Sequence, residues 1–239
     1  MANSYPIRPA DEAHRLQALR PYQLVSSIPD ALLDDLIRLA ATLFNVPIAI
    51  VAFVDASTVH FQLNVGLPND ATTQNRSESL CSVAILQGST VVFEDLGARP
   101  CELAEPGFVQ DLNLLFYAGS PMRTSAGHPV GVLCVIDHMP RRFGAEEREL
   151  LERLYVIVIR LLDMRLKALA DTPEPGAALL AGIYDQIESS VNRLGTLAEL
   201  AKWEEHDDTD GAVAYRHSTQ EEIGRVLDVL YAQIQTQLR

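Results

Sequence analysis

The spacing of the apolar residues changes at Pro47, and this change restricts the possible folds more than any other feature of the sequence. Before Pro47, the segment "ALLDDLIRLAATLF" places leucines three and four residues apart, which predicts an amphipathic helix. After it, "IAIVAFVD" and "VHFQLNVG" are β-branched and aromatic runs separated by "DAST", a pattern typical of two strands joined in a hairpin. A helix therefore leads directly into a sheet.

The other segments continue this mixture of helix and strand. Short helices are predicted around Leu16 and Leu19 and around Cys81. "STVVFEDL" predicts a third strand, and "FYAGSPMRTSAGHPVGVLCVID" predicts two more, joined by a turn in which Gly127 supplies a positive φ. A long connection rich in Pro and Gly lies between them, and loops of this length often cover a binding site. The order predicts an α+β fold, in which an antiparallel sheet carries helices on one face.

The longest predicted helix follows the last strand, from Glu147 to Ala170. One of its apolar stripes repeats every seven residues and a second stripe lies beside it, so one face can cover the sheet while the other meets a partner helix. We therefore predict a homodimer. Its interface is the repeating stripe, which consists of Leu150, Leu154, Ile157, Leu161 and Met164.

The segment "ADTPEPGA" has the composition of a linker, and two further helical stripes follow it. The first contains Ile187 and Leu194, the second contains Leu227 and Leu230, and the acidic segment "WEEHDDTDG" interrupts them. The sequence thus predicts two parts. Residues 1–170 form a domain with its flanking helices, and residues 171–239 form an acidic α-helical hairpin that dimerises or docks on a partner.

Composition and charge exclude several classes of function. The net charge of −13 argues against nucleic acid as a partner, because binding to the phosphate backbone needs clustered Lys and Arg. No apolar run approaches the ~20 residues that span a bilayer, and the first residues lack the pattern of a secretory signal. We expect a cytoplasmic protein without a membrane segment. The three cysteines have no metal-ligand spacing, so no metal site is predicted.

Two motifs carry a family resemblance. The stretch "RSESLCSVAI" keeps the pattern Arg-x-x-Ser-Phe-Cys-Ala-His-Ala-Ile, except that Leu80 stands in place of Phe and Val83 in place of His. "FYAGSPMRT" and "GVLCVID" agree with a second signature. From about Asp11 to Ala168, the sequence resembles bacterial GAF domains of the kind found with histidine kinases and diguanylate cyclases.

This resemblance implies a GAF/PAS-like antiparallel sheet flanked by helices, in a sensory module that is often dimeric. Such modules bind a small molecule and pass the change along their terminal helices to an output. The resemblance leaves the ligand and any cofactor unidentified. The motif of the cyclic-nucleotide subgroup is absent, and "DLNLLFYAG" lacks the cysteine to which other members attach a bilin.

A ligand pocket is expected between the sheet and the connection from Asp95 to Phe116. Its predicted lining is largely aromatic, although the same side chains could simply shape the core: Phe53, Phe61, Phe108, Phe116, Tyr117, Ser120 and Met122. Arg76 and Arg123 are candidates for a forked bond to a carboxylate or phosphate of the ligand. The alternative for both arginines is a structural salt bridge.

Cys81 is either a buried packing residue or adjacent to the ligand. A reactive thiolate needs a nearby cation, a His or a helix N-terminus, and Val83 occupies the position at which the family often has a His. Cys134, in an apolar strand, is expected to pack in the core, and Cys101, in a polar loop, is the thiol expected to be exposed.

Three functions remain open from the sequence. The first is a non-catalytic sensory GAF module that dimerises and takes part in signal transduction, as in two-component systems. The second is an enzyme similar to the GAF proteins that reduce free methionine sulfoxide, which the placement of the three cysteines on separate elements disfavours. The third is a ligand-free dimeric scaffold.

Overall fold

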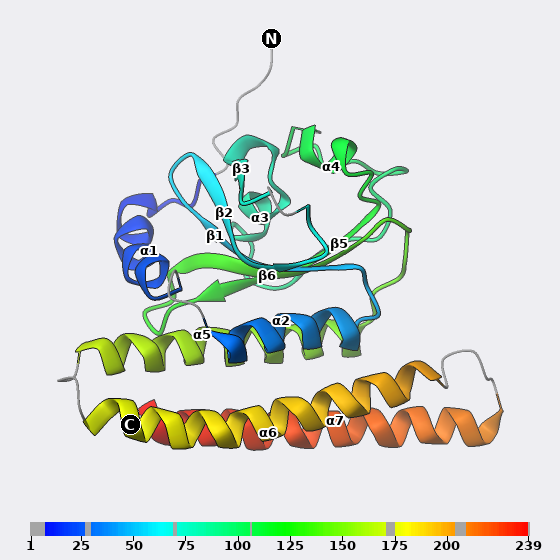
Figure 1. The fold of residues 1–239 in the computed structure, drawn as a ribbon. Helices are drawn as coiled ribbons and strands as arrows, with labels where there is room; N and C mark the ends of the chain where they lie inside the picture. The colour runs from blue at the N-terminus through cyan, green and yellow to red at the C-terminus, as the bar shows by residue number, and fades with distance from the viewer. Residues whose placement is uncertain are drawn as a thin grey trace, which may run out of the picture.

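A six-stranded antiparallel sheet divides the molecule into two unlike sides (Figure 1). The structure is a computed structural model, and it describes residues 8–26, 30–68, 71–105, 107–170, 175–203 and 209–238. The strand order is β3-β2-β1-β6-β5-β4. The strands are β1 (Ile48–Val54), β2 (Thr58–Val65), β3 (Thr73–Asn75), β4 (Val91–Phe93), β5 (Phe116–Arg123) and β6 (Pro129–Asp137). The α+β fold predicted from the sequence is confirmed.

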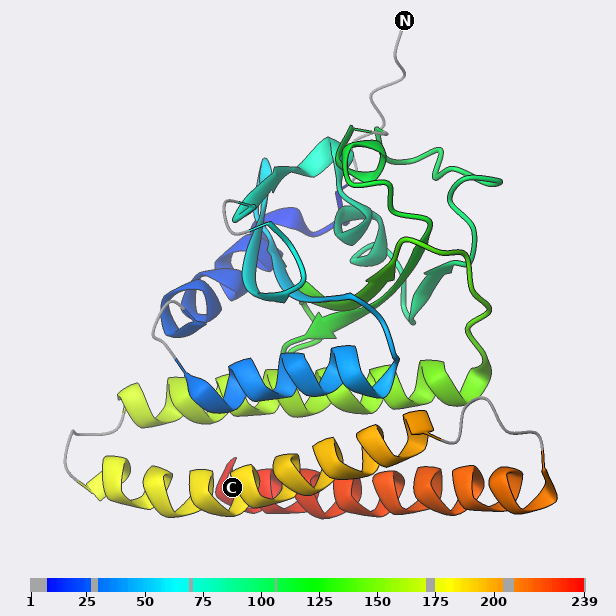
Figure 2. The same cartoon turned by 45° about the vertical axis from the view of Figure 1, so that its right-hand side comes forward.

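The helices lie in layers below, above and beside this sheet (Figures 1 and 2). Helices α2 (Ala31–Leu43) and α5 (Ala145–Ala170) cover the lower face, and α1 (Glu12–Ser26) lies at one end of the sheet, against α5 and β6. The upper side holds the short elements η1 (Arg76–Glu78), α3 (Leu80–Ala84) and α4 (Gly107–Asp111). A further layer under α2 and α5 consists of α6 (Pro175–Trp203) and α7 (Asp210–Leu238).

Helix α2 begins where Asp30 caps it. The Asp30 carboxylate accepts hydrogen bonds from the backbone N–H groups of Leu32 and Leu33 at 2.9 and 3.2 Å, which satisfies donors that a helix leaves unpaired in its first turn. The same carboxylate forms an ion pair with Arg165 of α5 at 2.8 Å. One side chain thus starts α2 and ties it to its neighbour.

The C-terminal helices form a hairpin that lies under α2 and α5. The hairpin packs with α6 against α2 and with α7 against α5. Apolar stripes of both helices are buried in the core that continues up to the sheet, as predicted from their spacing: Ile187, Val191, Leu194 and Ala198 in α6, and Ile223, Leu227, Leu230 and Ile234 in α7.

This packing places the predicted dimer interface inside the chain. Leu154, Ile157, Leu161 and Met164 are each at most 3% exposed, and Leu150 is partly buried against the same core. An amphipathic stripe shows that a helix has a partner, but it does not show whether the partner belongs to the same chain. These side chains are buried within the chain, where α5 packs against α7 and also against the sheet, so a second copy cannot reach them in this arrangement.

Strand β3 was not predicted, because it lies in a polar stretch that gives no apolar alternation. Thr73 and Asn75 are exposed, and the strand forms through backbone pairing with the edge of β2, opposite Thr58 to His60. Among the described helices, none combines the length and the apolar character that crossing a bilayer requires.

Candidate functional site

The predicted pocket residues lie on opposite faces of the sheet. Phe53, Phe116 and Met122 belong to the core on the side of α2 and α5, whereas Phe61, Tyr117 and Cys81 belong to the core under α3. The reason is the alternation of side chains along a strand, which sends the neighbours Phe116 and Tyr117 in opposite directions. These residues therefore cannot line one shared pocket, and the single-pocket prediction is wrong.

The residues on the helical side form core packing and a polar link. Phe116 stacks on Phe143 with ring centroids 5.5 Å apart, and the guanidinium of Arg141 lies 5.4 Å from its centroid. The Ser120 hydroxyl lies 2.7 Å from the Thr90 hydroxyl, which donates to the Glu152 carboxylate at 2.7 Å. This chain of hydrogen bonds connects β5 to α5.

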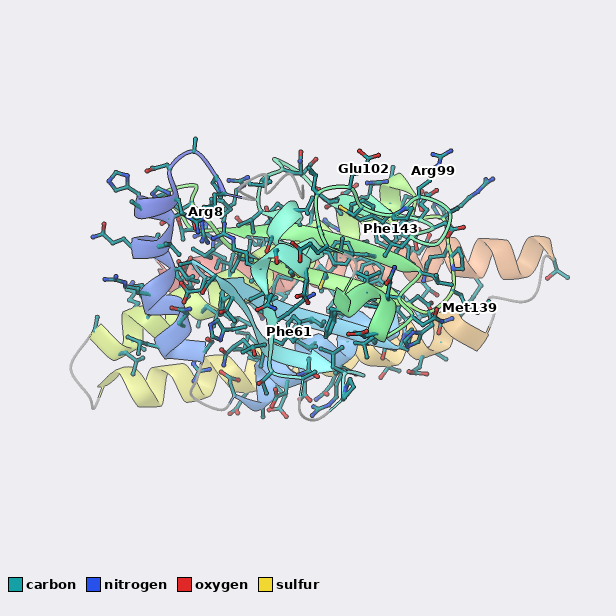
Figure 3. The ribbon with its side chains drawn as sticks, turned by 90° about the horizontal axis from the view of Figure 1, so that it is seen from above. Arg8, Phe61, Arg99, Glu102, Met139 and Phe143 are labelled. Atoms are coloured by element: carbon teal, nitrogen blue, oxygen red, sulfur yellow. The ribbon has the colours of Figure 1, made fainter. Side chains whose placement is uncertain are left out.

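Aromatic rings fill the opposite side, beneath the connection from Glu94 to Leu115. Phe61 and Phe108 have ring centroids 5.5 Å apart, and Phe93 and Tyr117 have centroids 6.2 Å apart. Seen from above, Phe61 lies over the sheet, whereas Arg99 and Glu102 of the connection point away from the molecule (Figure 3).

A cluster of two thiols and a phenol lies at the centre of this side. The sulfur atoms of Cys81 in α3 and Cys134 in β6 are 3.9 Å apart, and the Tyr117 hydroxyl donates to the Cys81 sulfur at 3.6 Å. All three side chains are buried. Gly119 makes the arrangement possible, because it lies opposite Cys134 and a Cβ there would come within 2.3 Å of the Tyr117 hydroxyl. The sequence analysis predicted neither this contact nor a role for Tyr117 in it.

The three groups perturb one another. The hydrogen bond with Cys134 and that from Tyr117 lower the pKa of Cys81, against the opposing effect of burial. The same bond to Cys81, together with burial, raises the pKa of Cys134 well above its ordinary value. Burial, followed by the charge of the neighbouring thiolates, raises the pKa of Tyr117. Of the two thiols, Cys81 is therefore the one that ionises more readily.

Arg76 belongs to a buried ion cluster at the other end of the upper side. It contacts Glu12 of α1 through both terminal nitrogens, and Nη1 also donates to the backbone oxygen of Asp55 at 2.8 Å. Arg15 binds the same carboxylate through Nε and Nη2, each at 2.8 Å, and donates to the Val54 oxygen at 2.6 Å. These contacts favour the structural salt bridge, and not a ligand contact, for Arg76.

Burial of Glu12 by itself raises its pKa, but the hydrogen bonds and charges of Arg15 and Arg76 outweigh that effect and lower the pKa from 4.5 to about 2. A carboxylate whose pKa is lower in the folded state stabilises the fold above its unfolded pKa, and this stabilisation is lost as the pH falls through the folded value.

We therefore expect the stability difference between the wild type and Glu12→Gln to be constant from neutral pH down to about pH 5, and to shrink between about pH 4.5 and 2. Urea denaturation at a series of pH values measures it. A difference that persists undiminished at the lowest pH would contradict the assigned role of the Glu12 charge.

Arg123 also makes structural contacts. Its guanidinium donates to the backbone oxygens of Gly127 and Gln87, at 2.9 and 2.7 Å. Gly127 has the positive φ predicted for this turn, at 86°. Arg123 thus holds the β5–β6 turn against the segment that follows α3.

A cavity of about 480 Å³ opens at the junction of the sheet domain and the hairpin. It lies between the end of α2, the start of α5 and the middle of α7. One part of its wall is apolar, with Leu43, Phe44, Leu150, Ala198 and Ile223, and the other part is polar, with Arg141, Arg153, Glu146, Glu149, His217 and Glu221. The sequence predicted Leu150 for a dimer interface and Ala198 and Ile223 for the helical stripes, but it assigned none of the three to a ligand site. Within the described ranges, no group of three or more His, Cys, Asp or Glu side chains is placed to hold a metal ion.

Comparison with characterised proteins gives one relative of known activity. Over 198 residues the chain is 28% identical to a cyclic di-GMP phosphodiesterase of Pseudomonas aeruginosa, and the match covers 82% of this chain and 33% of that protein. The chain thus spans about a third of the length of this relative.

Two solved structures match this chain at low sequence identity. A type II free methionine-R-sulfoxide reductase from Thermoplasma acidophilum is 16% identical with a TM-score of 0.48, over 59% of this chain and 94% of that one. The GAF domain of an Acinetobacter phosphoenolpyruvate-protein phosphotransferase is 17% identical with a TM-score of 0.43, over 64% and 93% of the two chains.

The family comparison covers the sheet. Residues 29–157, more than half of the chain, match the model of the GAF domain, from α2 through all six strands into α5. This match agrees with the motifs around Cys81 and after Phe116. The chain belongs to the GAF domain family.

Proposed function

We propose that this chain is a non-catalytic sensory module of bacterial signal transduction, which binds a small molecule or a partner and reports it through the C-terminal hairpin. The observation that carries the proposal is the continuous core that runs from the sheet through α2 and α5 to α6 and α7. A structural change in the sheet domain can therefore reach the hairpin through side chains that are in contact. The length of the P. aeruginosa relative, of which this chain spans about a third, supports a role beside an output that turns over cyclic di-GMP.

The cavity at the junction is the proposed ligand site. Its volume of about 480 Å³ lies within the range of roughly 300–1,000 Å³ that small-molecule sites usually have. Because its wall includes both α5 and α7, a bound molecule would change how firmly the hairpin holds to the domain. The aromatic side of the sheet is filled by its own side chains, so it supports a ligand less well.

We propose that the chain dimerises through α5 only when the hairpin has left the domain. The stripe that contains Leu154, Ile157 and Leu161 is buried while the hairpin is docked, and the side of α5 that packs against α7 would become available to a second copy when the hairpin leaves. An exposed stripe of this kind would pair with another apolar helix, because burying it removes apolar surface from water. The hairpin would then act as a cover that controls association.

The test compares two substitutions on α7. Leu230 is fully buried and Val229, its neighbour, is 54% exposed. We expect the wild type and Val229→Asp to sediment as monomers at tens of micromolar, and Leu230→Asp to form a dimer, because a buried charge without a partner expels the hairpin. Circular dichroism checks that Leu230→Asp keeps its sheet. A folded Leu230→Asp that stays monomeric, or a wild type that is already dimeric, would contradict the conditional dimer.

The enzyme alternative rests on the contact between Cys81 and Cys134. Reduction of free methionine sulfoxide needs a reactive thiol beside a substrate-sized space, whereas both of these thiols are buried among core side chains. The geometry therefore favours the regulatory function. The scaffold alternative differs in predicting that no small molecule stabilises the chain.

A further inference from the structure

Cys81 and Cys134 form a pair that the proposed sensory function does not use. They are 53 residues apart in the sequence, yet their sulfur atoms are 3.9 Å apart in the core under α3. The sulfur atoms of a disulfide are separated by about 2.05 Å, so the pair would have to close by about 2 Å to form a bond. A rotation of the Cys81 side chain or a shift of α3 would supply this movement.

The two elements differ in their ability to move. Cys134 lies in β6, which has strands β1 and β5 on either side. Cys81 lies in α3, a helix of five residues whose first turn is capped by the Ser79 side chain. The sheet fixes one sulfur, and the short helix carries the other toward it.

The surroundings also distinguish the two thiols chemically. Cys81 accepts the Tyr117 hydrogen bond and has the lower pKa, whereas the pKa of Cys134 is raised. The thiolate is the nucleophilic form of cysteine, so Cys81 is the sulfur that reacts first with an electrophile. Cys134 is then the neighbouring thiol that resolves the product.

We propose that Cys81 and Cys134 form a reversible disulfide when the protein meets a two-electron oxidant of the hydroperoxide class. In the first step the Cys81 sulfur attacks one oxygen of hydrogen peroxide, the O–O bond breaks, and a sulfenic acid and water form. In the second step the Cys134 sulfur attacks the Cys81 sulfur, the S–O bond breaks, and the hydroxide leaves as water with the Cys134 proton. Two thiols and one peroxide thus give one disulfide and two waters, and an added dithiol reverses the reaction.

The bond would join α3 to the centre of the sheet. It would also convert the sulfur that accepts the Tyr117 hydrogen bond into half of a disulfide, so the buried hydroxyl would need another acceptor. Both effects fall on the side of the sheet opposite the hairpin. The inference does not depend on the proposed sensory function, since the reaction requires only the two thiols and their neighbours.

The test treats the full chain with hydrogen peroxide, blocks the remaining thiols by alkylation, and maps the peptides without reduction. We expect one linked peptide pair that contains Cys81 and Cys134, with a mass loss of about 2 Da that dithiothreitol reverses. Cys101 is half-buried in the connection and serves as the matched control. The variant Cys101→Ser should keep the link, and Cys134→Ser should lose it.

Tyr117→Phe tests the role of the hydroxyl as a positioning and charge-stabilising group. We expect the pH at which the rate of linkage is half-maximal to rise in this variant, an effect that a purely structural role for the ring would not produce. A link that involves Cys101, or a Cys81–Cys134 pair that stays reduced in the wild type while Cys101 is oxidised, would overturn the proposal. Both of these results are measured on the wild type, so the test does not depend on the folding of any variant.

Discussion

Glu12→Gln is expected to lower the free energy of unfolding at neutral pH by about 3–5 kcal/mol, the cost typical of removing one partner from a buried ion pair. The side chains of Arg15 and Arg76 are 1% and 6% exposed, and both place their guanidinium groups on the Glu12 carboxylate. Gln preserves the shape of the side chain and removes the charge. The two buried guanidinium groups would then lose the carboxylate that both of them bind.

Asp11→Asn is the matched control for this substitution. Asp11 precedes Glu12, its side chain is 59% exposed, and its pairing is with His14, which is also exposed. Exposed pairs contribute about 0–1 kcal/mol, so Asp11→Asn should leave the urea midpoint almost unchanged. Equal effects of the two substitutions would show that the cluster does not hold α1 in place.

Gly66→Ala is expected to destabilise the chain by about 3 kcal/mol, because it combines backbone strain with a clash. Gly66 follows β2 with a φ of 84°, a conformation that L side chains rarely adopt. A Cβ atom there would lie 2.0 Å from the backbone oxygen of Pro47, so the backbone has to move. Thermal or urea denaturation measures the loss.

Gly127→Ala separates the strain from the clash. Gly127 has nearly the same φ, 86°, but a Cβ atom there meets nothing within 4 Å. We expect it to cost about 1–2 kcal/mol, from the left-handed conformation alone. If both glycines respond equally, the contact with Pro47 contributes nothing to the requirement for Gly66.

The general fold was predictable because apolar spacing and turn residues agree along most of the chain. The stretch around β1 illustrates this agreement: an unbroken apolar run predicted a strand, and all seven of its side chains are buried. The apolar stripes predicted beyond residue 180 likewise lie on helices and are buried. Strand β3 was not predictable in this way, because backbone pairing at a sheet edge leaves no mark on side-chain polarity.

The site was predicted less well, for two physical reasons. The pocket prediction grouped Phe116 with Tyr117, although adjacent strand residues point to opposite faces, so this error was avoidable from the sequence. The contact between Cys81 and Cys134, in contrast, could not have been predicted from the sequence. It depends on the strand register that brings Gly119 opposite Cys134, and on how Tyr117 lies over that glycine.

The position of Glu12 also bears on the choice of boundaries when the domain is cut out for expression. The segment that matches the family begins at residue 29, so a fragment with those limits leaves α1 behind. Arg76 would then keep its place in the sheet domain and lose its only carboxylate partner among the described residues. At the other limit, a fragment that ends at residue 157 would stop inside α5, and the rest of this helix, which covers the lower face of the sheet, would be missing. The smallest soluble unit is therefore expected to begin before Glu12 and to continue through the hairpin.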